Sequence, residues 1–145
     1  MAHVRQQIRE YFGTTLTGLT TTGTRVHESR VYPLESLPAL VIYTKSETSE
    51  PVVIGSAREL LRELEVVVEG YAKATTNFDD TIDTICKEVE EAIAADPTLN
   101  SVAKDAFISS TEIDFNSEGE KPLGFVTMTF TVQYHTHEND VETAI

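Results

Sequence analysis

The segment His135-Thr136-His137-Glu138 holds the residues of this sequence that most resemble metal ligands. Alternate residues of an extended chain point to the same side, so both imidazoles would share one face. Two histidines and a carboxylate can bind zinc, and the segment therefore allows a small metal-dependent enzyme that uses His135, His137 and Glu138. The sequence favours the other interpretation, in which these are exposed residues at the end of a strand, because a metal site needs further ligands. We therefore expect no bound metal.

Other catalytic patterns are absent from the sequence. The serines lack a Gly-x-Ser-x-Gly context, and the seven glycines are too scattered to form a phosphate-binding loop. Cys86, the single cysteine, lies beside Ile85 in an apolar stripe, which is typical of a small buried side chain rather than of a reactive thiol. The carboxylate pairs Asp79-Asp80 and Glu90-Glu91 are adjacent, so they diverge on a helix. We predict no enzyme, no catalytic or cofactor-binding residue and no cofactor.

Composition indicates a single folded domain. The chain has 145 residues, 40% of them hydrophobic, and a formal net charge of −13 at pH 7. We assign residues 1–137 to one domain and the acidic residues 138–145 to a flexible tail. The charge excludes nucleic-acid binding that neutralises phosphates, and it serves either solubility or a passage from which a polyanion is repelled. We expect no signal peptide and no membrane association, because no apolar run approaches roughly 20 residues.

Hydrophobic spacing predicts the order helix, three strands, helix, two strands. Apolar residues recur every three or four positions in both predicted helices, and the strands are extended or alternating. The predicted helices are His3–Leu16, stopped by a left-handed Gly18, and Thr75–Ala95, capped by Asn77; the predicted strands are Thr24–Tyr32, Leu37–Thr44, Arg58–Ala72, Phe107–Phe115 and Gly124–Tyr134.

The strand Gly124–Tyr134 organises the prediction. Its apolar residues, from Val126 to Tyr134, alternate with three threonines and a glutamine, which indicates one dry face and one wet face. Phe107–Phe115 alternates as well, and the turn Asn116–Lys121 joins the two strands into a hairpin. The fold class is therefore α+β, with a single mainly antiparallel sheet of four to five strands and two helices packed on one face.

Helices on one face leave part of the sheet surface uncovered. Leu40–Tyr43 is apolar without alternation, and Glu63, Glu65 and Glu69 form an outward row on the next strand. Either a second chain covers the apolar strand, or the long polar loop Lys45–Ala57 folds over it.

Four segments resemble a known family. They are Arg25-Val26, followed by Arg30-Val31-Tyr32-Pro33-Leu34, then Leu37-Pro38-Ala39-Leu40-Val41-Ile42-Tyr43, and later Leu64-Glu65-Val66-Val67-Val68-Glu69-Gly70-Tyr71. Together with the order of elements, they resemble the tail terminator, or tail completion, proteins of long-tailed phages, the group of minor tail protein U. The resemblance spans most of the chain, from the first helix to about His135.

The resemblance implies a non-enzymatic component of the virion tail, assembled in the host cytoplasm. Such proteins form a ring, usually a hexamer, on the head-proximal end of the tail tube, end tube polymerisation and offer a surface to the head completion or connector protein. DNA passes through the ring without specific binding. The alternative within the same class is a neck or head-tail connector protein. The residues expected at contacts with neighbouring copies, with the tail tube protein or at the lumen are Arg25, Arg30, Tyr32, Lys45, Glu47, Glu50, Glu63, Glu65 and Glu69.

Overall fold

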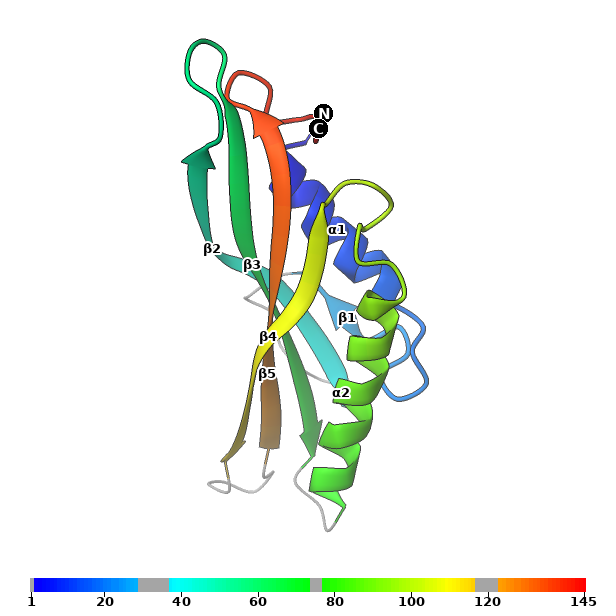
Figure 1. The fold of residues 1–145 in the computed structure, drawn as a ribbon. Coiled ribbons are helices and arrows are strands. Elements are labelled where there is room, and N and C mark those ends of the chain that lie inside the picture. Colours follow the sequence, from blue (N-terminus) through cyan, green and yellow to red (C-terminus); the bar gives the residue numbers. More distant parts are fainter. Residues whose placement is uncertain (1, 29–36, 74–76, 117–122) are drawn as a thin grey trace.

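The computed structural model of the chain describes residues 2–28, 37–73, 77–116 and 123–145. Arg30, Tyr32 and most of the predicted turn Asn116–Lys121 lie outside these ranges. Within them the chain forms two helices and five strands in the predicted order (Figure 1): α1 (Val4–Leu16), β1 (Val26–His27), β2 (Ala39–Pro51), β3 (Glu59–Lys73), α2 (Phe78–Ala94), β4 (Asp105–Asn116) and β5 (Leu123–His137).

The five strands form one sheet in the order β1-β2-β3-β5-β4. All neighbouring strands are antiparallel except β1 and β2, which run parallel. Both helices pack against the same face of the sheet (Figure 1). The predicted α+β class, with a mainly antiparallel sheet and two helices on one face, is confirmed.

β5 has the alternation that the sequence predicts. Its even-numbered residues from Val126 to Tyr134 are at most 1% exposed and face the helices, whereas the threonines between them are half-buried. Phe12 of α1 packs edge-on against Phe130, with ring centroids 5.4 Å apart. α1 ends at Leu16, and Gly18 then has φ +96°, the left-handed conformation that favours glycine at this place.

α2 covers the other end of the same face. Its buried stripe includes Ile82, Ile85, Val89 and Ile93. Gly70 in β3 lets this helix approach, since a Cβ there would lie 2.9 Å from Cγ2 of Ile85. The helix begins after Asn77, as predicted, although the Asn77 side chain makes no capping hydrogen bond. Cys86 is buried on the same helix, as predicted, and burial raises the pKa of its thiol to about 11.

The predicted loop Lys45–Ala57 is wrong over its first half. β2 continues to Pro51, which pairs with Leu60 of β3, so only a short turn separates the two strands. Residues 44–50 are rich in threonine, serine and glutamate, a composition that is typical of loops. Backbone pairing with β3 nevertheless keeps them in an extended strand.

Of the two alternatives for covering Leu40–Tyr43, a second chain is not needed for the first three residues. Leu40, Val41 and Ile42 are at most 5% exposed within the single chain, and Tyr43 is half-buried. Leu40 and Ile42 point to the helices as members of the core. The described part of the predicted strand Thr24–Tyr32 is short: β1 spans two residues and lies at the edge of the sheet, as expected.

β4 contains a bulge between Ile108 and Ser110. An extra residue reverses the alternation. Phe107 therefore lies on the face away from the helices, whereas Ile113 and Phe115 share the helix face with Val126 and Gly124. The sequence pattern had placed these three side chains on one face, which is wrong for this reason.

Residues 138–145 lie against the domain. Val4 N–H donates to the carbonyl of Val141 (2.8 Å), and Ile145 N–H donates to the carbonyl of His135 (2.9 Å). Ala144 packs against the core. The two ends of the chain thus meet beside α1 (Figure 1), where the sequence pattern had predicted a flexible tail.

Candidate functional site

The face of the sheet away from the helices, called here the open face, is rich in acidic side chains. Odd-numbered residues of β3 and β5 point to this side, because the even-numbered ones form the core. Acidic residues that point to it are Glu50 of β2, Glu59, Glu63, Glu65 and Glu69 of β3, and Asp105, Glu112 and Asp114 of β4. The predicted outward orientation of the three β3 glutamates is confirmed, while their role in contacts stays a prediction.

Neutral donors, rather than basic residues, accompany the β3 glutamates. Gln133 Nε2 donates to Glu63 Oε1 (3.1 Å), and Ser46 Oγ donates to Glu65 Oε2 (3.1 Å). Burial raises the pKa of Glu69, against the opposing effect of hydrogen bonds from Tyr71 and Tyr43. The three carboxylates therefore form a row along the middle of the open face.

A shallow hollow of about 300 Å³ crosses the open face. Residues that line it include Tyr43, Lys45, Val67, Glu112, Thr127 and Thr129. Lys45 is the bulged residue of β2, since the register shifts between Thr44 and Ser46. A shallow polar hollow with one ammonium and one carboxylate has neither the depth nor the apolar lining of a typical small-molecule site.

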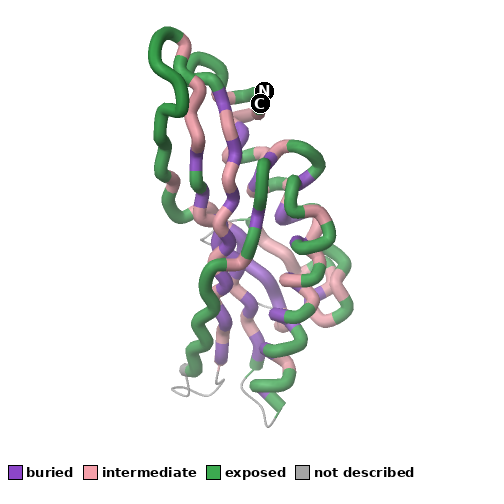
Figure 2. Tube along the Cα trace, in the orientation of Figure 1, coloured by how far each residue is buried: buried purple, intermediate pink, exposed green. Residues whose placement is uncertain are grey.

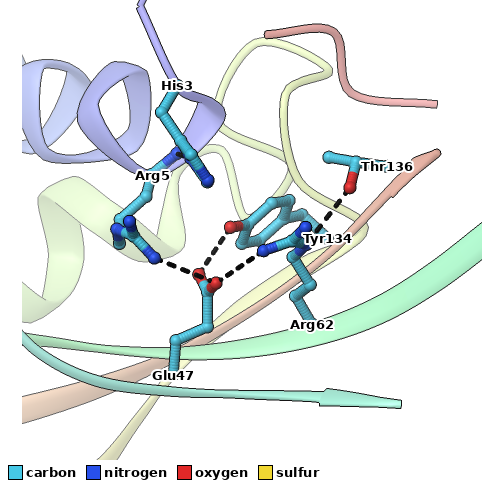
Figure 3. A network of polar contacts seen from close by, with 6 residues as sticks. All are labelled: His3, Arg5, Glu47, Arg62, Tyr134 and Thr136. Carbon is cyan, nitrogen blue, oxygen red and sulfur yellow. Dashed lines mark hydrogen bonds and ion pairs between the residues drawn. The ribbon is translucent and has the colours of Figure 1, made fainter. Parts of the chain in front are cut away.

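Glu47 lies in a buried polar network on the opposite, helix-covered side (Figure 3). Its side chain is 8% exposed. Its carboxylate receives hydrogen bonds from Arg5 of α1 (3.1 Å), from Arg62 of β3 (3.0 Å) and from the hydroxyl of Tyr134 in β5. Arg62 Nε also donates to Thr136 Oγ1 (3.1 Å). One carboxylate therefore connects α1 with three strands.

The bulge at Lys45 explains this position of Glu47. Alternation counted from Leu40 and Ile42 would place Glu47 on the open face, but the extra residue reverses the faces beyond it. Glu47 is thus not displayed on an exposed loop, as the sequence pattern had predicted for a contact with the tail tube.

Burial dominates the electrostatics around Glu47. It raises the pKa of Tyr134, and the neighbouring Glu47 carboxylate raises it further, so the phenol stays a donor. Burial, followed by the charge of Arg5, lowers the pKa of His3. The neutral His3 ring accepts a hydrogen bond at Nδ1 from Arg5 N–H (3.0 Å) at the start of α1.

The remaining predicted contact residues are dispersed. Arg25 donates from Nε to the carbonyl of Pro38 (2.6 Å) and from Nη2 to that of Thr21 (3.1 Å), so its guanidinium braces the edge of the sheet. Lys45 and Glu50 are exposed on β2. The structure therefore brings Lys45, Glu63, Glu65 and Glu69 to one face, and it separates them from Glu47 and Arg25.

The histidine segment is divided between a hydrogen bond and an ion pair. His135 Nδ1 lies 2.7 Å from Glu59 Oε1, and Glu138 pairs with Arg58 at 3.4 Å. Among the residues that the structure describes, no group of three His, Cys, Asp or Glu side chains is placed to hold a metal ion.

Sequence reasoning overlooked an exposed apolar surface at the end of the β2–β3 hairpin. Val52 and Val53 are 45% and 46% exposed, and Ile54 is fully exposed. Figure 2 shows this end of the hairpin as an almost continuous exposed segment. The Val-Val-Ile run between Pro51 and Gly55 was the available signal, because three aliphatic residues are unusual in a polar loop.

Comparisons with known proteins give a likeness to solved structures but no family. The sequence matches no protein-family model and no curated protein. A chain of the structure titled "Virion of native gene transfer agent (GTA) particle" is similar with a TM-score of 0.38 and 12% sequence identity, over 90% of each chain. Neither of the described helices is long and apolar enough to cross a membrane.

Proposed function

We propose that this chain is a structural virion protein, and specifically a tail terminator that forms a ring on the head-proximal end of a tail tube. The observation that carries the proposal is the separation of charge from apolar surface. Carboxylates gather on the open face, whereas exposed aliphatic side chains gather at the end of the β2–β3 hairpin. A ring subunit needs both surfaces: one that faces the lumen and one that contacts other proteins.

The open face fits a passage for DNA. Eight carboxylates of the described strands point to it, and Lys45 is the ammonium that lines its hollow. Like charge keeps phosphates from binding to a wall, so a polyanion would slide past it. In this proposal the role is non-enzymatic, and the tail tube protein and a head connector protein are the partners.

The resemblance of Arg25–Tyr43 and Leu64–Tyr71 to tail terminators supports the narrower proposal. The order of helices and strands found here is the order that this resemblance implied. The location that follows is the virion tail, reached after assembly in the host cytoplasm.

Deletion of the gene in the host that produces the particles tests the function. Electron micrographs with overlong tails support a terminator, because nothing then stops tube growth. Tails of normal length beside unjoined heads would instead assign the chain to the neck as a connector. Particles of normal form and number would contradict both assignments.

Charge reversal on the open face tests its position at the lumen. Glu63→Lys, Glu65→Lys and Glu69→Lys together raise the formal charge from −13 to −7, two charges for each substitution. We expect rings and joined particles with slowed DNA ejection, measured by the rate of DNA release. A matched triple change to Gln removes the charge without creating phosphate ligands, and it should affect release less.

A further inference from the structure

An apolar hollow lies between α2 and β4, called here the α2–β4 hollow. It has a volume of about 390 Å³. Ile93 and Ala94 at the end of α2, with Glu90 one turn earlier and Pro97 just beyond the helix, line one side, and Ala106 and Ile108 of β4 line the other. Ala94 and Pro97 are exposed, so apolar surface here meets water in the single chain.

The hairpin tip, residues 52–57, is an apolar projection from the sheet. Ile54 is fully exposed at its end, and Gly55 follows with φ +110°. Two long paired strands support the tip. The pairing of β2 with β3 begins at the pair Ala39 and Tyr71 and continues to the pair Pro51 and Leu60, next to the tip. The projection therefore has a firm base in the sheet (Figure 1).

We infer that the hairpin tip of one copy inserts into the α2–β4 hollow of the next copy. The chain carries 24 acidic and 11 basic residues, so copies repel one another over most of their surfaces. The tip has no charged residue. A neutral apolar projection and a largely apolar hollow are therefore the pair of surfaces on which this acidic chain can meet itself.

The order of the strands makes this contact head-to-tail. The tip belongs to β2 and β3, whereas the hollow belongs to β4 at the far edge of the sheet. Two different surfaces of each copy are then used, which builds a ring or an open chain rather than a two-fold dimer. The inference deepens the proposed function and rests on it for the closure of the ring.

Disulfide trapping between singly substituted full-length chains tests the contact. Ile54→Cys and Ala94→Cys chains of different tag size are mixed and oxidised; the native Cys86 is buried and adds little background. We expect disulfides between the two variants. Thr84→Cys is the matched control, exposed on the same helix about 15 Å from position 94, and should trap poorly.

Equal trapping at position 84, or disulfides that join Ile54→Cys chains to each other as readily, would overturn the inference. Trapping of the same cysteines inside purified particles separates the inference from the function. A disulfide from position 54 to a different virion protein there leaves the virion role intact and overturns the contact between copies. Absence of the protein from particles contradicts the function instead.

A second variant measures the contribution of the tip. Ile54→Asp should weaken self-association at least about tenfold by sedimentation, because a fully exposed aliphatic residue loses its burial in the partner. Thr48→Asp, an exposed change on the same hairpin, is the control for added charge. Both chains should keep the unfolding midpoint of the parent. Equal weakening by the two variants would contradict a specific role of the tip.

Discussion

At the scale of single residues, Glu47 illustrates how one extra residue in a strand changes a side chain's environment. The bulge at Lys45 moves the carboxylate from the open face to the helix side, between Arg5 and Arg62. Arg62 is 9% exposed and has little access to water. Glu47 therefore neutralises the buried charge of Arg62. The same carboxylate also pairs with Arg5, and this second contact links α1 to the β2–β3 hairpin.

Glu47→Ala should lower the free energy of unfolding by about 3 kcal/mol, because it leaves the Arg62 guanidinium buried without its counter-charge. Urea denaturation measures the change. Glu50→Ala is the matched control, since Glu50 is exposed three residues further along the same strand, and it should stay within about 0.5 kcal/mol of the parent. Similar losses in both variants would contradict the role assigned to the network.

Tyr71 makes stability depend on pH in alkali. Burial first, and the charge of Glu69 second, raise its pKa to about 12, whereas a tyrosine in the unfolded chain ionises near about pH 10. The folded state holds the proton longer, so this contribution is complete below about pH 10 and is lost as pH rises towards about 12. Tyr71→Phe should reduce the fall in unfolding free energy across that interval.

Glu69→Gln provides the comparison for Tyr71. Removal of the Glu69 carboxylate takes away the second cause of the raised Tyr71 pKa and leaves burial as the first. The fall in unfolding free energy between about pH 10 and about pH 12 should therefore become smaller without vanishing. Denaturant unfolding at several alkaline pH values gives the slopes. If Tyr71→Phe has the slope of the parent, the tyrosine is not responsible.

At the scale of elements, Gly124 sets the distance between β5 and the start of α2. A methyl group at this position would overlap the ring of Phe78, which also packs edge-on against Phe115 at 5.5 Å. Gly124→Ala should destabilise the fold by about 1–3 kcal/mol through overpacking. Thermal unfolding of Gly124→Ala, Phe78→Leu and the double variant completes the test. The double variant should lose less than the sum of the single losses; additive losses would contradict the steric cause.

The periodic segments of the sequence were sufficient to predict the helices and strands. They were not sufficient to predict the bulges that interrupt two of the strands. The stripe from Ile82 to Ile93 and the alternation from Val126 to Tyr134 each repeat enough to specify a face. The bulges near Lys45 and Ser109 leave no composition signal, and each reverses the residues beyond it. For that reason the three β3 glutamates were placed correctly, whereas Glu47 and Phe107 were not.

At the scale of the whole molecule, charge opposes association and apolar surface favours it. A copy with 24 acidic and 11 basic residues repels its neighbour over a distance set by salt, about 30 Å at 0.01 M and about 8 Å at 0.15 M. Insertion of the hairpin tip into the α2–β4 hollow involves little charge. The net effect of salt on assembly therefore comes from the repulsion.

Self-association of the chain should tighten as salt rises from about 0.01 M to about 0.15 M, because screening reduces the repulsion and leaves apolar burial almost unchanged. Sedimentation velocity across a dilution series at each salt concentration measures the association constant. Ile54→Asp should show weaker association at every concentration and a salt dependence of the same sign. A contact built from ion pairs would respond in the opposite way, so association that loosens with added salt would contradict an apolar contact between copies.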